Sequence, residues 1–175
     1  MKAAVDVTKV VAAHYYDGRT STNVADERQL QKERDFEMAL IVAGITPHFL
    51  PVREIPKPCP GEDDVKYRLA QKGVDVELAI DVLDFAHEDR YDVAVLITGD
   101  SDFVPLVRRI TSLNKHTLIG RFDFDAWTDD NGVPHRPTRV SGDLVEAASY
   151  SLNFNQLVGD RDWKSEIQSL FFMPK

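Results

Sequence analysis

Two aspartates, Asp100 and Asp102, follow closely on the apolar run VAVLI of residues 93–97 and are separated only by Ser101. Carboxylates held this close repel each other unless a proton or a cation intervenes. Ligation by oxygen alone favours Mg²⁺ or Mn²⁺ over zinc, and a chain with a single cysteine offers no thiolate cluster. The spacing therefore predicts a divalent-cation site, with a helix-capping Asp102 beside a solvated Asp100 as the simpler alternative.

A second acidic element is KGVDVELAIDVL, residues 72–83, whose apolar positions recur at helical spacing. Asp75 is expected on the apolar side of this helix, where a carboxylate is costly unless it is ligated or hydrogen-bonded. Asp81 lies about 240° away from Asp75 around the helix axis. That position is more typical of a solvated charge, although a supporting or ligating role for Asp81 stays open.

Other polar residues near these aspartates have two interpretations each. Lys72 fits a surface charge or a phosphate contact. Ser101 is expected to contact a phosphate or water, because no histidine stands near it in sequence to make it a nucleophile. Arg108 and Arg109 are interpreted as complements of a helix dipole, with a local basic patch as the alternative. The five histidines are scattered, and no metal role is expected for them.

The order of elements predicts an α/β fold with a Rossmann-like, mostly parallel sheet flanked by helices on both faces. Ligands of such sheets gather beyond the carboxyl ends of the strands, where Asp100 is expected. The predicted strands are 9–16, 45–52, 93–97, 116–120 and 150–158, and the predicted helices are 24–43, 74–86, 103–113 and 141–149, the last with Ser141 as a cap. The proline-rich segment 53–64 is expected to be a loop, and 122–140 an irregular insertion or hairpin.

Composition sets broad limits on the class of protein. The chain has 175 residues, 43% of them apolar, and a formal net charge of −8, which argues against broad coating of nucleic acid. No apolar run approaches the roughly 20 residues that span a bilayer, and the N-terminus lacks a secretory pattern. A domain over 1–159 with a tail over 160–175, located in the cytoplasm, is expected. The tail could dock on the core or serve a homo-oligomer or another protein partner.

The two motifs, KGVD opening a helix and GDSDFVP following a buried strand, resemble the NYN domain in its LabA-like (DUF88) branch, within the PIN-like nuclease superfamily. The segment HYYDG resembles the second strand of the family, and SGDLVEAASYSLNFNQL resembles its closing helix and strand. The resemblance implies a metal-dependent endoribonuclease acting on RNA, single-stranded RNA in particular. It also implies that Asp75, Asp100 and Asp102 hold Mg²⁺ or Mn²⁺.

One departure from the family pattern and two alternatives accompany this interpretation. The family opens with a strand that ends in an aspartate and is followed by a helix, and the 14 residues before Tyr15 are too few for both. Asp6 is the single candidate there, so an incomplete site that binds RNA or a protein without cleavage is the second hypothesis. A haloacid-dehalogenase-like phosphatase also uses Asp-x-Asp after a strand, but its motif normally stands near the start of the chain.

Overall fold

Parallel strand pairs form the centre of each of the two units into which the chain divides, Met1–Asp81 and Val82–Lys175. The computed structural model describes residues 9–19, 27–57, 66–70, 73–129 and 132–159. Helix α2 (Val74–His87) contains the boundary between the two units.

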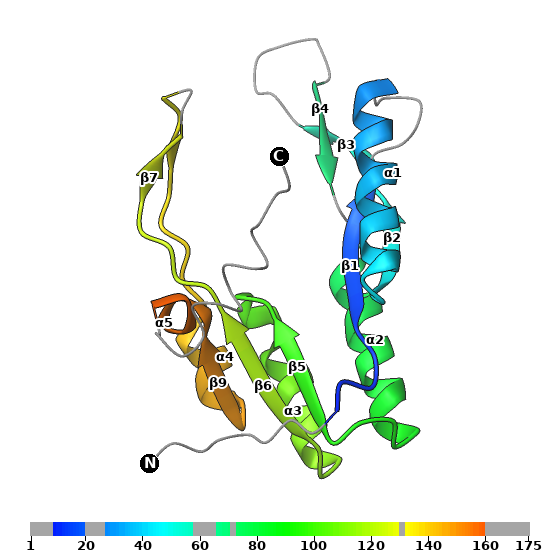
Figure 1. Cartoon of the computed structure of the whole chain (residues 1–175), viewed down its shortest axis with the longest axis vertical. Helices are drawn as coiled ribbons and strands as arrows, with labels where there is room; N and C mark the ends of the chain where they lie inside the picture. The colour runs from blue at the N-terminus through cyan, green and yellow to red at the C-terminus, as the bar shows by residue number, and fades with distance from the viewer. Residues whose placement is uncertain (1–8, 20–26, 58–65, 71–72, 130–131, 160–175) are drawn as a thin grey trace. The chain divides into compact units, whose positions relative to one another are not determined.

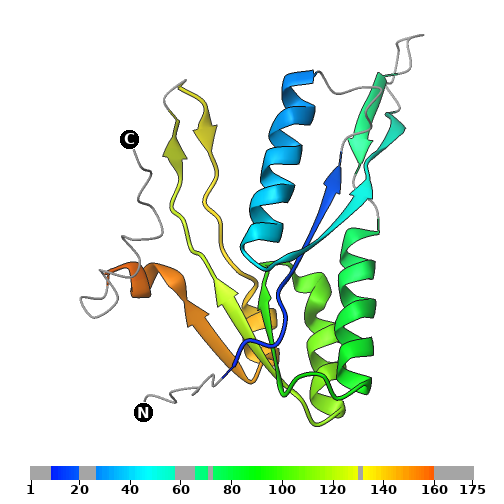
Figure 2. The same ribbon diagram turned by 45° about the vertical axis from the view of Figure 1, so that its right-hand side comes forward.

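In the first unit, β1 (His14–Arg19) pairs in parallel with β2 (Thr46–Pro51). The connection between them includes α1 (Glu27–Val42), which lies alongside the two strands in Figure 2. The helix gives way to a turn in which Gly44 has a φ of +77°, a conformation that favours glycine.

Successive residues of β1 face opposite sides of the pair, as the pleat requires. Tyr15 packs edge-on against Phe36 of α1, with ring centroids 5.4 Å apart. Tyr16 instead donates a hydrogen bond to Asp81 of α2. The parallel strands therefore have a helix on each face, which confirms the predicted layering for this unit.

The predicted loop over 53–64 is wrong for its first residues. Residues Arg53–Lys57 form β3, which pairs antiparallel with β4 (Lys66–Ala70), and Pro56 stands opposite Tyr67. Proline lacks an N–H donor but is tolerated in a two-stranded ribbon, where one edge needs no partner. The remainder of the predicted loop, including Cys59, lies outside the described residues.

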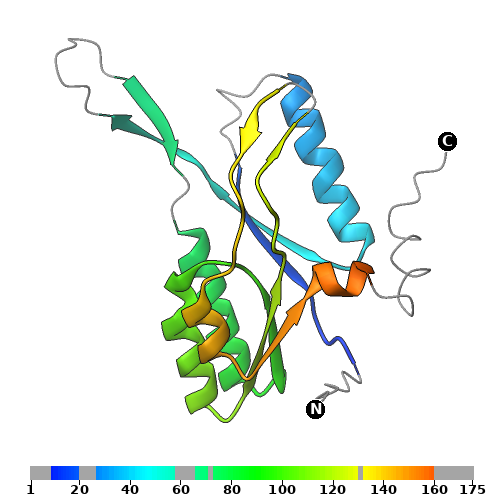
Figure 3. The same ribbon diagram turned by 90° about the vertical axis from the view of Figure 1, so that its left-hand side faces the viewer.

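In the second unit, three parallel strands stand in the order β5-β6-β9, as Figure 1 shows. They are β5 (Val93–Ile97), β6 (His116–Arg121) and β9 (Tyr150–Asn153). Between β5 and β6 come the 3₁₀ turn η1 (Ser101–Phe103) and α3 (Val104–Ser112), and α4 (Gly142–Ala147) precedes β9. Figure 3 shows α3 and α4 on the same face of this sheet.

The core of the second unit lies between this sheet and the two helices. Among the described residues, four of its apolar side chains are fully enclosed: Val107 and Ile110 of α3, Ile119 of β6 and Leu144 of α4. Ala94 and Leu96 of β5 are also buried, whereas Val95 and Ile97, which alternate with them, are 51% and 64% exposed. One face of β5 is thus covered and the other is largely open.

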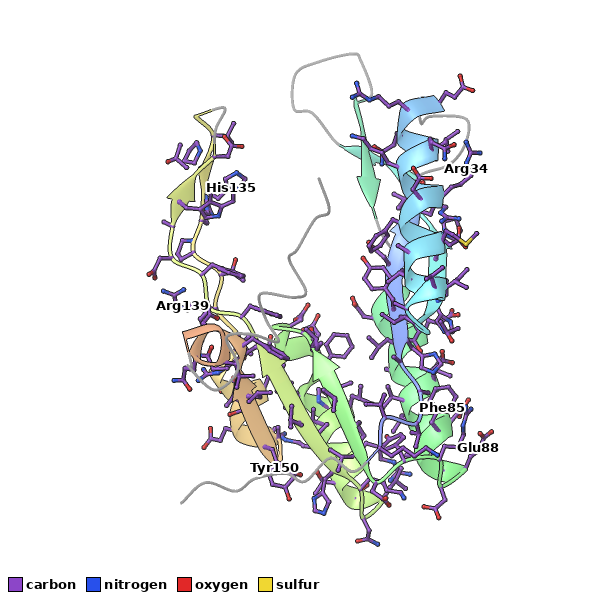
Figure 4. All side chains as sticks on the ribbon, viewed as in Figure 1. Arg34, Phe85, Glu88, His135, Arg139 and Tyr150 are labelled. Carbon is purple, nitrogen blue, oxygen red and sulfur yellow. The ribbon has the colours of Figure 1, made fainter. Side chains whose placement is uncertain are left out.

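The predicted insertion over 122–140 contains a hairpin of two short antiparallel strands, β7 (Trp127–Thr128) and β8 (Pro134–His135). One arm continues from β6 and the other leads to α4 in Figure 3, and His135 and Arg139 mark the second arm in Figure 4. The predicted last strand is half wrong, because β9 ends at Asn153 and Phe154–Gly159 form the short helix α5. Asn153 accepts a hydrogen bond from the Asn155 backbone, a turn that an alternating pattern does not reveal.

The observed architecture is mixed α/β, with parallel strands in sheets flanked by helices, so the predicted fold class is confirmed. Within the described residues, none of the helices is long and apolar enough to cross a membrane. The predicted division into residues 1–159 and a tail stays a prediction, and the tail from 160 onward lies outside the described residues.

Candidate functional site

The turn that follows β5 places two carboxylates at the carboxyl end of a parallel strand. Asp100 has extended backbone angles (φ −84°, ψ 127°) and caps η1, because its Oδ1 accepts a hydrogen bond of 2.9 Å from the Asp102 N–H. The Asp100 N–H is itself 3.3 Å from the Thr98 hydroxyl. One oxygen of Asp100 therefore fixes the turn. Both aspartate side chains are exposed.

The alternative in which Asp102 caps the following helix is wrong. The residue at the cap position of α3 is Phe103, which makes no side-chain capping bond, and Pro105 occupies the first turn. Asp102 lies within η1, and its carboxylate has no hydrogen bond or ion pair to the described residues. Both carboxylates of this turn thus retain oxygen atoms that a cation could bind.

The backbone beneath this turn is held by the start of α4. The Ser141 N–H donates to the Gly99 carbonyl at 3.1 Å. A Cβ added at Gly99 would lie 3.6 Å from Val140, an ordinary contact, so the turn does not require glycine at this position. Ser141 stands at the cap position of α4 but makes no side-chain capping bond, contrary to the prediction.

Asp75 is the second residue of α2, in the positively polarised first turn of the helix together with Glu77. Its side chain is exposed, while the neighbouring Val74 is buried. The expectation that Asp75 lies in an apolar environment is therefore wrong, because the apolar spacing of α2 does not correspond to a fully covered face. Val76 and Ile80 are also more than half exposed. The ligand role of Asp75 stays a prediction.

Asp81 is not the solvated charge that the helical spacing favoured. Its Oδ2 accepts a hydrogen bond of 2.7 Å from the Tyr16 hydroxyl and lies 3.7 Å from Nδ1 of His48. The rings of Tyr16 and His48 stack with centroids 4.4 Å apart, and Nδ1 of His14 is 3.0 Å from Nε2 of His48. Asp81 thus joins β1 and β2 to α2.

Burial raises the pKa of the Tyr16 phenol above its ordinary value of 10.0. The hydrogen bond to Asp81 and the negative charges of Asp81 and Glu77 raise this pKa further, because both disfavour a phenolate. Tyr16 is therefore protonated, and remains a donor to Asp81, throughout the neutral pH range.

The group of Tyr16, His14, His48 and Asp81 was missed by the sequence interpretation, which treated the histidines as isolated. The signal that could have found part of it is the register of β1 and β2, which places Tyr16 opposite His48. Register in a parallel pair depends on how the strands meet in space, and residue spacing along the chain does not give it.

The predicted site residues divide between the two units. Asp75 and Asp81 belong to the first, and Asp100, Asp102 and Ser101 belong to the second. Lys72, like Asp6, lies outside the described residues. Within the part of the chain that is described, no group of three or more histidine, cysteine, aspartate or glutamate side chains is arranged to hold a metal ion. Joint ligation by Asp75, Asp100 and Asp102 stays a prediction.

Comparison with protein families gives a match that includes the acidic turn and the helix that carries Asp75. The family described as NYN domain matches residues 2–130. The chain belongs to the NYN domain family. Both motifs, KGVD at 72–75 and GDSDFVP at 99–105, fall within the match, as do β1 and β6. The NYN domain is placed in the PIN-like nuclease superfamily. Membership of the LabA-like branch stays a prediction.

One solved structure similar to this NYN domain is that of a protein of unknown function from Vibrio parahaemolyticus. It is 21% identical in sequence, with a TM-score of 0.48, and the similarity covers 88% of this chain and 72% of the other. Comparison with curated proteins gives no match.

Proposed function

We propose that this NYN domain is an endoribonuclease that hydrolyses phosphodiester bonds of single-stranded RNA with Mg²⁺ or Mn²⁺. The observation that supports this most directly is the turn after β5, which presents Asp100 and Asp102 at the carboxyl end of a parallel strand. The chain also belongs to a family of the PIN-like nuclease superfamily, which supports a role for these carboxylates in phosphodiester hydrolysis. Asp75, assigned by its motif, is the third proposed ligand.

The donor set fits a hard divalent cation. Both side chains of the turn are exposed carboxylates, and Asp100 uses Oδ1 to accept the Asp102 N–H. Oxygen donors of this kind suit Mg²⁺ and Mn²⁺. Bound there, the cation would lower the pKa of a coordinated water and neutralise charge on the scissile phosphate. We assign the cation to Asp75, Asp100 and Asp102.

Of the remaining residues, two are proposed to contact the substrate, and one is proposed to support the helix that carries Asp75. Ser101 is exposed between the two aspartates, where its hydroxyl can donate a hydrogen bond to a phosphate oxygen. Lys72 is proposed as a phosphate contact through its positive charge. Asp81 is hydrogen-bonded to Tyr16, so we assign it the support of α2 in place of the ligand role considered from sequence.

The test is cleavage of a labelled single-stranded RNA in Mn²⁺ or Mg²⁺ by the wild type and by an Asp100→Asn, Asp102→Asn variant. Asparagine is chosen because its amide oxygen can still accept the Asp102 backbone N–H, so the turn survives while the charge is removed. We expect the rate to fall by roughly 100-fold or more, as for the loss of metal ligands. Chelation of the metal by EDTA should have the same effect.

A matched control removes two exposed aspartates of the same unit, Asp84→Asn and Asp92→Asn, and should keep the wild-type rate. Equal rates in the acidic-turn variant and this control would refute the proposal. Hydrolysis of an aryl phosphate without RNA cleavage would instead favour the phosphatase.

The second candidate is a NYN module that binds RNA or a protein partner without cleaving RNA. It is favoured by the acidic balance of the chain, whose formal net charge is −8. RNA binding with the same affinity in both variants, and no cleavage in either metal, would support this function.

A further inference from the structure

A pocket of about 430 Å³ opens beside the acidic turn, within the second unit. Its wall is made by η1 and the first turns of α3 on one side and by α4 on the other. Its lining includes Ser101, Val104, Pro105 and Arg108 on the first side and Asp143 and Glu146 on the second. Its volume falls in the range of ligand sites, roughly 300–1,000 Å³.

The pocket combines one positive group with two negative groups. Arg108 projects from α3, and Asp143 and Glu146 from α4, and all three side chains are exposed. No ion pair joins Arg108 to either carboxylate in the described structure, so all three retain hydrogen-bonding capacity toward a ligand. The excess of negative charge disfavours a phosphate group within the pocket and favours a ligand that offers N–H donors.

We propose that this pocket receives a guanine base of the RNA substrate, an inference that rests on the proposed function. Guanine offers two adjacent donors, N1–H and the N2 amino group, which a carboxylate can accept together. On its other edge it offers the acceptors O6 and N7, which arginine contacts with two hydrogen bonds. Asp143 or Glu146 would accept from the first edge, and Arg108 would donate to the second. The apolar surfaces of Val104 and Pro105 would contact the face of the ring.

Ser101 connects the pocket to the proposed cleavage site. It lies between Asp100 and Asp102 in sequence and lines the pocket as well. A base held in the pocket therefore belongs to a nucleotide close to the phosphate that the two aspartates serve. The pocket acts as a specificity-determining subsite, and guanine next to the cleaved bond is the substrate class that it selects.

The test is fluorescence anisotropy with labelled five-nucleotide RNAs that are identical except for a central guanine, adenine, cytosine or hypoxanthine. Binding is measured in EDTA at low salt, so that cleavage does not contribute to the signal. We expect guanine to bind roughly 5- to 100-fold more tightly than adenine, the range for a bidentate base contact. Hypoxanthine, which lacks the N2 amino group, should bind with intermediate affinity.

An Asp143→Asn, Glu146→Gln variant should bind guanine and adenine RNAs equally, because an amide presents only one acceptor where guanine needs two. The matched control, Asp84→Asn with Glu88→Gln, removes one aspartate and one glutamate elsewhere on the surface and should keep the preference. Thermal unfolding by circular dichroism checks that both variants remain folded. Equal binding of all four RNAs by the wild type, or a guanine preference that survives Asp143→Asn, Glu146→Gln, would overturn the proposal.

The outcome separates this inference from the proposed activity. Guanine-selective binding without cleavage in Mn²⁺ would support the pocket and refute the nuclease. If RNA is cleaved in Mn²⁺ but neither binding nor cleavage prefers guanine, the base-binding role of the pocket is refuted and the proposed nuclease activity is supported.

Discussion

Removal of the Tyr16 hydroxyl should destabilise the chain through the loss of one long-range hydrogen bond. The donor and acceptor, Tyr16 Oη and Asp81 Oδ2, are 2.7 Å apart and 65 residues apart in sequence. A hydrogen bond to a charged group contributes about 1.5–3 kcal/mol. The Asp81 side chain is 26% exposed, so water can partly replace the lost donor. We therefore expect Tyr16→Phe to lower the free energy of unfolding by about 1.5 kcal/mol, the low end of that range.

The assay is urea unfolding followed by circular dichroism, with Tyr15→Phe as the matched control. Tyr15 also donates to a carboxylate, that of Asp17 at 2.9 Å, but the two residues are neighbours in one strand. An unfolded chain can form such a local bond in part, so Tyr15→Phe should cost only about 0.5 kcal/mol. Phenylalanine at position 16 can keep the stack on His48, which restricts the change to the hydroxyl.

A double-mutant cycle decides whether the effect arises from the Tyr16–Asp81 contact. Tyr16→Phe and Asp81→Ala should together cost less than the sum of their separate effects, with a coupling of roughly 1 kcal/mol. Additive effects, or a loss for Tyr16→Phe no larger than that for Tyr15→Phe, would refute the view that this bond joins α2 to the strands.

Two further predictions concern alkaline pH and the open face of β5. Burial raises the pKa of Tyr91 to about 12 in the folded chain, from 10.0. The protonated Tyr91 phenol therefore contributes its full stabilisation below pH 10. This contribution is lost as the pH rises toward 12, because the phenol of the unfolded chain releases its proton at a lower pH than that of the folded chain. Unfolding free energies measured from pH 9 to 12 should fall less steeply in Tyr91→Phe. For β5, Val95→Thr with Ile97→Thr should reduce concentration-dependent self-association in sedimentation velocity, since exposed apolar side chains promote association between chains. Unchanged association would contradict that reasoning.

The elements that sequence predicted best are those whose residue types and spacing favour a single local conformation. Residues 93–97 were expected as a strand and form β5 with those bounds, because an apolar β-branched run between turns has few other stable conformations. The predicted helix at 74–86 corresponds to α2 almost to the residue. In both cases local pattern and tertiary environment favour the same structure.

The errors occur where a partner distant in sequence decides the structure. Proline at position 56 indicated a loop. Instead, this segment pairs antiparallel with β4, and a two-stranded ribbon tolerates a proline because one of its edges needs no hydrogen-bond donor. Asp81 was interpreted as solvated because Tyr16 comes from a strand more than sixty residues earlier. The role of Asp100 as the cap of η1, in place of Asp102, depends on backbone angles that residue types alone do not specify.

The geometry of the acidic turn depends on apolar residues that are buried on either side of it. Below the turn, Ala94 and Leu96 are buried in the sheet, and beyond it Val107 and Ile110 are fully enclosed. Phe103, which directly follows Asp102, is buried as well, so the backbone has little freedom to move the carboxylates apart, and the Asp100 side chain uses one oxygen to restrict it further. A cation site requires such preorganisation, because charges that repel each other must be held together before the ion arrives. The same rigid segment carries Ser101 and Arg108 into the neighbouring pocket. On the proposed function, one short connection would hold both the carboxylates that bind the cation and the residues that contact the base.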